Sequence, residues 1–168
     1  AVLIYYMSYT IPAGTHIGHI HLKVSDIDKS LEFYQGMLGF EIMQRYGAQA
    51  VFISAGGYHH HIGLNTWHSK GAGPAKVNAV GLYHTAIVYP ERKDLAAVLM
   101  RLIDANYPLT GSSDHGVSEA IYLNDPDGNG VELYWDKPKE QWPFDEEGNL
   151  QMVTEYLHVE SLLAELDK

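Results

Sequence analysis

Two histidines and one glutamate are the residues of this sequence whose types and spacing best suit chemistry. His19 and His84 are 65 positions apart, and each opens a short run rich in Ile, Val and Leu. Glu132 lies in the segment GVELYW, where strand alternation would place it on the face opposite Val131 and Leu133. A carboxylate among apolar residues must be solvated, paired or bound to a metal, because an isolated buried charge is very costly. Two imidazoles and one carboxylate form the facial ligand set of non-haem Fe(II).

Taken singly, each of these residues also fits an ordinary structural role, as a hydrogen-bonded core histidine or an edge glutamate. The positions of the two histidines in an internal repeat favour the metal-binding role over the structural one. GHIHLKVSDIDKSLEFYQGML, from Gly18, and LYHTAIVYPERKDLAAVLMRL, from Leu82, both predict a strand, a polar turn and an amphipathic helix. His19 and His84 take equivalent places in the two copies.

Strand-like segments follow each predicted helix and complete the two halves. The turn NDPDGNG, residues 124–130, predicts a tight hairpin, because Asp-Gly and Asn-Gly adopt positive φ at low cost. We therefore expect an α+β protein with two tandem βαβββ modules, residues 16–67 and 80–136, whose curved sheets pair into a cup. Residues 137–168 should form a C-terminal extension with an amphipathic helix.

The composition restricts the classes of function. A formal net charge of -10 and the lack of a basic run argue against a nucleic-acid partner. Zero cysteines exclude disulfides, thiolate metal sites and a thiol nucleophile. The apolar segment 1–6 is too short to span a bilayer and lacks a basic flank, so we expect a cytoplasmic protein without a membrane partner. Met7 is a candidate natural start, which leaves it open whether residues 1–6 are native.

Four motifs together resemble the vicinal oxygen chelate superfamily, which includes glyoxalase I, fosfomycin and bleomycin resistance proteins and extradiol dioxygenases. These motifs are GHIHLKVSDIDKSLEFYQGMLGFEI, YHHHIGLNTW, GLYHTAIV and SDHGVSEAIYLNDPDGNGVELYW, and the resemblance spans about residues 16–143. Within the superfamily, DHGVSEAIYL followed by DPDGNGVELYW is most similar to the catechol 2,3-dioxygenase-like branch. The resemblance implies Fe(II), with Mn, Ni or Zn as alternatives, a small aromatic substrate, dioxygen, and a homodimer or higher homo-oligomer.

The resemblance also implies roles for individual residues. His19, His84 and Glu132 match the metal ligands of extradiol enzymes. Tyr122, ten residues before the glutamate, matches an active-site tyrosine, and His115 matches more loosely a histidine that supports it. Both would donate hydrogen bonds to the substrate.

The histidine run in YHHHIGL leaves a choice open. The family pattern places the acid–base histidine at His60, whose ordinary pKa near 6.5 suits proton transfer. If Ile62 faces the helices, simple alternation would instead turn His59 and His61 into the cup. A bulge at residues 56–57 would restore His60, which is the residue we prefer.

Two other functions compete with the dioxygenase. Many extradiol dioxygenases have four modules, whereas this chain has two, as glyoxalase I does. A glyoxalase-like metal-dependent isomerase or lyase is therefore the second candidate. A small-molecule-sequestering resistance protein is the third, because such members generally lack the metal ligands that this chain retains.

Overall fold

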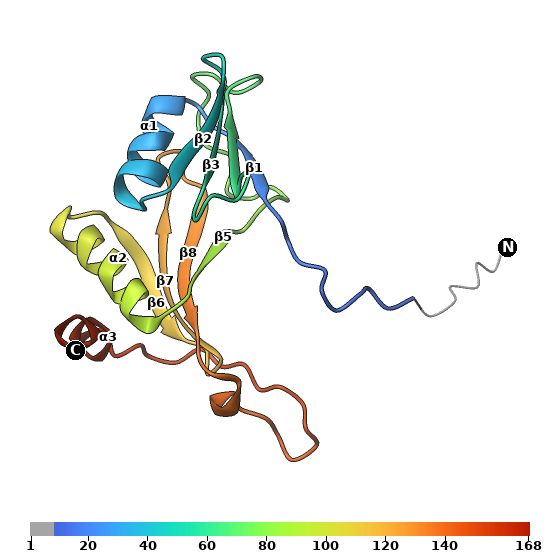
Figure 1. Ribbon diagram of the computed structural model, residues 1–168, viewed down its shortest axis with the longest axis vertical. Helices are drawn as coiled ribbons and strands as arrows, with labels where there is room; N and C mark the ends of the chain where they lie inside the picture. The colour runs from blue at the N-terminus through green and yellow to red at the C-terminus, as the bar shows by residue number, and fades with distance from the viewer. Residues whose placement is uncertain (1–8) are drawn as a thin grey trace, which may run out of the picture.

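Two four-stranded mixed sheets form the framework of the computed structural model, which describes residues 9–168 (Figure 1). The candidate start Met7 and residues 1–6 lie outside the described residues. The first sheet has the order β1-β4-β3-β2 and contains β1 (Ile20–Lys23), β2 (Glu41–Tyr46), β3 (Ala50–Ser54) and β4 (Ile62–Asn65). The second has the order β5-β8-β7-β6 and contains β5 (Thr85–Tyr89), β6 (Leu109–Asp114), β7 (Ser118–Asn124) and β8 (Gly130–Asp136).

The two sheets repeat one topology. β1 pairs in parallel with β4 and β5 pairs in parallel with β8, whereas the other neighbours are antiparallel. The predicted hairpin joins β7 to β8, with Asn124 opposite Gly130. The fold class predicted from the sequence, two tandem βαβββ modules, is thus confirmed.

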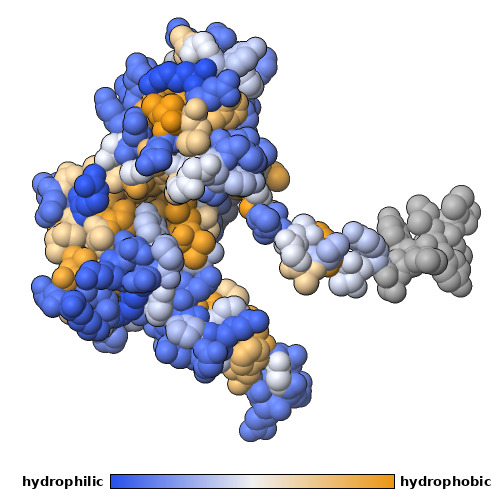
Figure 2. Space-filling model, viewed as in Figure 1, coloured by the Kyte–Doolittle hydropathy of each residue, from blue (hydrophilic) through white to orange (hydrophobic). Residues whose placement is uncertain are grey.

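One helical segment follows the first strand of each module. In the first module, α1 (Ile27–Leu31) continues into the π-helical turn η1 (Glu32–Met37), and the Asp26 carboxylate caps α1 by accepting from the Lys29 N–H at 3.0 Å. In the second, α2 (Arg92–Asp104) begins with a capping box formed by Glu91 and Asp94. Both helices lie on the same side of the molecule in Figure 1, and hydrophobic residues are visible between their hydrophilic surfaces in Figure 2.

The core lies between the helices and one face of each sheet. On β8, Val131 and Leu133 are fully buried, whereas Glu132 and Tyr134 are half-buried on the opposite face. The α2 residues Leu95, Val98, Leu99 and Leu102 are buried at the helical spacing read from the sequence. Strand alternation therefore leaves the second face of each sheet free to carry polar side chains.

The two modules contact each other through the helices and the β7–β8 turn. The Tyr34 hydroxyl donates to Asp125 Oδ2 at 2.9 Å, and the Ser25 N–H donates to Asp127 Oδ2 at 2.9 Å. Arg101 donates to main-chain carbonyls of η1 at 2.9 and 3.1 Å. β1 and β5 end the strand order of their sheets and so present open edges.

The C-terminal extension returns to the second module. It contains the short helices η2 (Lys139–Gln141), α3 (Val159–Leu163) and η3 (Ala164–Asp167). Arg92 ties it to the module, because its guanidinium binds Glu119 of β7 at 2.7 Å and Glu165 at 2.8 Å. No helix in residues 9–168 combines the length and apolarity needed to cross a bilayer.

Candidate active site

His84 and Glu132 meet at the junction of β5 and β8. The parallel register sets Ala86 opposite Glu132, and His84 immediately precedes β5. His84 Nε2 lies 2.9 Å from Glu132 Oε2, with 29% and 13% of the side chains exposed. His84 Nδ1 is buried and has no hydrogen-bond partner in the described residues. His84 Nε2 and Glu132 Oε2 thus converge, while the other ring nitrogen of His84 is left without a hydrogen-bond partner in the described residues.

Gly130 allows this close approach. A Cβ built at Gly130 would overlap the Tyr83 carbonyl oxygen and lie 3.1 Å from the His84 Cβ. The absence of a side chain at the first residue of β8 therefore positions His84. The asparagine–glycine pair that we interpreted as a turn signal has this second consequence, which only the packing of β5 against β8 reveals.

A chain of hydrogen bonds extends from Glu132 to the C-terminal extension. Tyr122 lies opposite Glu132 on β7, and its hydroxyl is 3.3 Å from Glu132 Oε1. The same hydroxyl is 2.6 Å from His115 Nε2, and His115 Nδ1 is 2.8 Å from the Val153 carbonyl oxygen. Burial, followed by the charge of Glu132, raises the pKa of Tyr122 to about 12, so the tyrosine is neutral at physiological pH. No sequence signal marks Val153, because it takes part through its main chain.

His19 and His60 are neighbours in the first module. Their rings have centroids 4.2 Å apart, and Phe52 of β3 lies 5.1 Å from His60. Burial, followed by the charges of His19 and His59, lowers the pKa of His60. His61 is held elsewhere: its Nδ1 accepts from the Ala55 N–H at 3.2 Å.

The structure shows why strand alternation does not settle the histidine run. β4 begins only at Ile62, so the side chains of His59 and His60 precede the strand pairing. Gly56 and Gly57 have φ of 67° and 78° and form the turn before the run. The ring of His60, rather than that of His61, lies beside His19, while the acid–base role of His60 stays a prediction.

The three predicted metal ligands do not all meet. Within residues 9–168, no cluster of three or more His, Cys, Asp or Glu side chains is arranged to hold a metal ion. His84 and Glu132 belong to the second module, whereas His19 precedes β1 of the first. The donors of the second module fit part of a divalent-metal site, since an imidazole and a carboxylate converge, and the second ring nitrogen of that imidazole has no hydrogen-bond partner in the described residues. That His19 completes the set stays a prediction.

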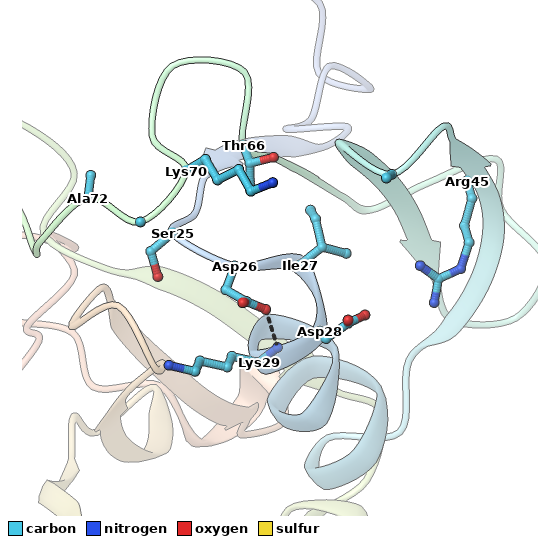
Figure 3. Close-up of a pocket in the computed structure, with 11 residues that line it drawn as sticks. Ser25, Asp26, Ile27, Asp28, Lys29, Arg45, Thr66, Lys70 and Ala72 are labelled. Carbon is cyan, nitrogen blue, oxygen red and sulfur yellow. Dashed lines mark hydrogen bonds between the residues drawn. The ribbon is translucent and has the colours of Figure 1, made fainter.

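Two pockets lie away from this pair. The first, of about 670 Å³, opens at the start of α1 and carries charged side chains that include Asp26, Lys29 and Arg45 (Figure 3). The second, of about 630 Å³, follows the edge of β1 and is also lined by Pro74 and by Asp127 of the other module. Neither pocket is lined by His84 or Glu132.

Comparison with known proteins defines the family. The sequence model of the Glyoxalase/Bleomycin resistance protein/Dioxygenase superfamily matches residues 16–133. The chain therefore belongs to this superfamily, and its two repeated modules agree with that assignment.

Among curated proteins, the chain is 40% identical over 156 residues to catechol-2,3-dioxygenase of Bacillus subtilis (strain 168), covering 93% of this chain and 54% of that protein. It is 29% identical over 120 residues to biphenyl-2,3-diol 1,2-dioxygenase 3 of Rhodococcus globerulus, covering 71% of this chain and 63% of that protein. The chain thus spans between half and two thirds of the length of these relatives.

Solved structures show the same fold. A glyoxalase/dioxygenase from Nostoc punctiforme aligns with a TM-score of 0.63 at 17% identity, over 78% of this chain and 98% of that one. Lactoylglutathione lyase from Agrobacterium tumefaciens aligns with a TM-score of 0.55 at 21% identity, over 75% and 96% of the two chains.

Proposed function

We propose that this protein is an extradiol-type dioxygenase that cleaves the ring of a catechol-type substrate. The 40% identity to a catechol-2,3-dioxygenase over 93% of the chain carries this proposal. The convergence of His84 with Glu132, and of Tyr122 with both Glu132 and His115, supports it from the geometry. Catechol and dioxygen would combine into a muconic semialdehyde, with both oxygen atoms retained in the product.

A divalent metal, Fe(II) in the first instance and Mn, Ni or Zn as alternatives, would be held by His84 and Glu132 with His19 as the third ligand. When bound, such a metal supplies open coordination positions for the vicinal oxygens of the substrate and for dioxygen. His19 would join the pair if the open edges of β1 and β5 came together, within one chain or between two copies. The second arrangement would make the active protein a homodimer or a higher homo-oligomer.

The protein's own side chains would orient the substrate and move its protons. His60 would accept the proton of the second catechol hydroxyl and later return it. Tyr122, oriented by its contact with His115, would hydrogen-bond to a substrate oxygen in a site that Glu132 and His84 anchor.

The test is reconstitution with Fe(II) under anaerobic conditions, followed by catechol and then air. A yellow ring-cleavage product is expected from the wild type and from a His158→Ala control, which removes an imidazole outside the site. His84→Ala should lose both the product and the bound iron, and full iron retention would contradict its assignment. Separate His60→Ala and His61→Ala variants test the histidine run: turnover should fall with the first alone, and loss with the second alone would reverse the assignment.

A glyoxalase-like isomerase or lyase is the second candidate. The fold shared with lactoylglutathione lyase favours it, because 96% of that chain aligns with 75% of this one. Turnover of methylglyoxal with glutathione, together with no oxygen uptake on catechol, would replace the first proposal by this one.

A further inference from the structure

We propose that the C-terminal extension fixes the proton on one nitrogen of His115 and thereby sets the direction of the Tyr122 hydrogen bond. The Val153 main-chain carbonyl is the group that does this. The catalytic consequence rests on the proposed function, whereas the proton placement itself does not. His115 acts here as a positioning residue.

The hydrogen bonds define the proton positions. A carbonyl oxygen only accepts, so the 2.8 Å contact with Val153 requires a proton on His115 Nδ1. In a neutral imidazole the other nitrogen, Nε2, is then an acceptor. Its partner at 2.6 Å is the Tyr122 hydroxyl, which must donate.

Tyr122 has only one hydroxyl proton to give. The carboxylate of Glu132 also only accepts, yet it lies 3.3 Å away, much farther than His115 Nε2. With the proton directed at His115, the hydroxyl oxygen presents its lone pairs to the site. Tyr122 would therefore accept a hydrogen bond from a catechol hydroxyl, which reverses the donor role that the family resemblance implies.

The extension is held firmly enough to impose this arrangement. The Val153 N–H donates to the His115 carbonyl at 3.1 Å, and Asp114 and Glu155 exchange main-chain hydrogen bonds of 2.9 and 3.0 Å. Lys137 adds contacts of 2.7 and 2.8 Å to the Asp114 carboxylate. Residues 153–155 therefore act as a short strand that is paired with the end of β6 and the following loop.

Gly116 fits tightly beneath the extension. A Cβ at this residue would lie 2.9 Å from Pro143 Cγ and 3.3 Å from Val153 Cγ2. The glycine thus permits the contact that brings the Val153 carbonyl to His115. Gly148 has a similar positive φ, 84° against 77°, but a Cβ there would meet nothing within 4 Å. The pair provides a matched comparison with equal backbone strain.

The test reads the His115 tautomer directly, from long-range ¹H–¹⁵N spectra of metal-free protein labelled with ¹⁵N-histidine. The His115 signals are identified by their loss in His115→Gln. The wild type should show the Nδ1–H tautomer. An Nε2–H tautomer in the wild type would overturn the inference, whatever the enzyme activity.

An ester in place of the 153–154 peptide bond weakens the Val153 carbonyl as an acceptor without changing any side chain. The Thr154 N–H makes no hydrogen bond in the described residues, so its loss is neutral. We expect a mixture of tautomers and a 3- to 10-fold fall in kcat with little change in KM. The same ester at the 151–152 bond is the control and should leave both unchanged. An unchanged tautomer in the 153–154 ester would refute the role of Val153.

Gly116→Ala and Gly148→Ala give a second, genetic comparison. Both should lower the melting temperature, but only Gly116→Ala should alter the His115 tautomer. Equal tautomer spectra in the two variants would contradict the proposal. If the tautomer follows the prediction and no ring cleavage occurs with any metal, the proposed function fails while the proton placement stands.

Discussion

Gly130 offers the sharpest test of how the fold positions the candidate metal ligands. In Gly130→Ala the new methyl group would overlap the Tyr83 carbonyl oxygen and press on the His84 Cβ at 3.1 Å. Non-bonded atoms settle about 3.5 Å apart, so β5 and β8 must separate by about 1 Å at this point. Overpacking of this kind costs about 1–3 kcal/mol. For a chain of this length the melting temperature should fall by about 2–12 °C.

The same displacement acts on the ligand pair. A shift of about 1 Å at His84 removes the 2.9 Å contact with Glu132 Oε2 and misdirects the imidazole. Loss of ligand orientation typically costs 10–100-fold in metal affinity, and we expect a fall of about this size. Calorimetric titration with Mn(II) measures it, and thermal unfolding of the metal-free protein measures the stability cost separately.

Gly81→Ala is the matched control. Gly81 lies three residues before His84, and a Cβ there meets nothing within 4 Å. This variant should keep the wild-type metal affinity. If Gly130→Ala also bound Mn(II) as tightly as the wild type, the close approach of β8 would not be what orients His84, and the reasoning would be refuted.

Two further predictions concern the hydrogen-bond chain and the extension. Tyr122→Phe should lower kcat about 5- to 30-fold, since it removes hydrogen bonds worth about 1–2 kcal/mol in total. Burial raises the pKa of Tyr122 to about 12, so wild-type activity should show no loss from ionisation of this tyrosine up to pH ~10. Burial alone would raise the pKa of Asp114, but the Lys137 hydrogen bonds and charge, the Gly116 N–H and the charge of His115 together outweigh it and lower that pKa. The stabilisation that the charged Asp114 gives the fold is therefore complete above the ordinary aspartate pKa near 3.8, and it is lost as the pH falls through the lowered pKa of the folded protein. Asp114→Asn should lose about 1 kcal/mol of unfolding free energy at neutral pH and match the wild type near pH ~2. Urea titrations at the two pH values measure this difference. An equal loss at both would contradict the ion pair as the cause.

The sequence by itself determined the repeated modules. Alternation along GVELYW places Val131 and Leu133 in the core and Glu132 on the other face, as the structure shows. The turn at residues 124–130 forms the β7–β8 hairpin. These features could be predicted because they depend on the periods of strand and helix and on local turn chemistry, which neighbouring residues encode.

Only the tertiary structure decided which functional groups meet. Strand parity could not choose between His60 and His61, because alternation holds only where strands pair and β4 begins at Ile62. The Val153 carbonyl reaches His115 through the main chain, a group that every residue carries and no residue type marks. The space at Gly130 is likewise a property of two strands packed together. Contacts of these kinds arise between segments far apart in the chain, so their physical cause lies in packing rather than in any local pattern of residues.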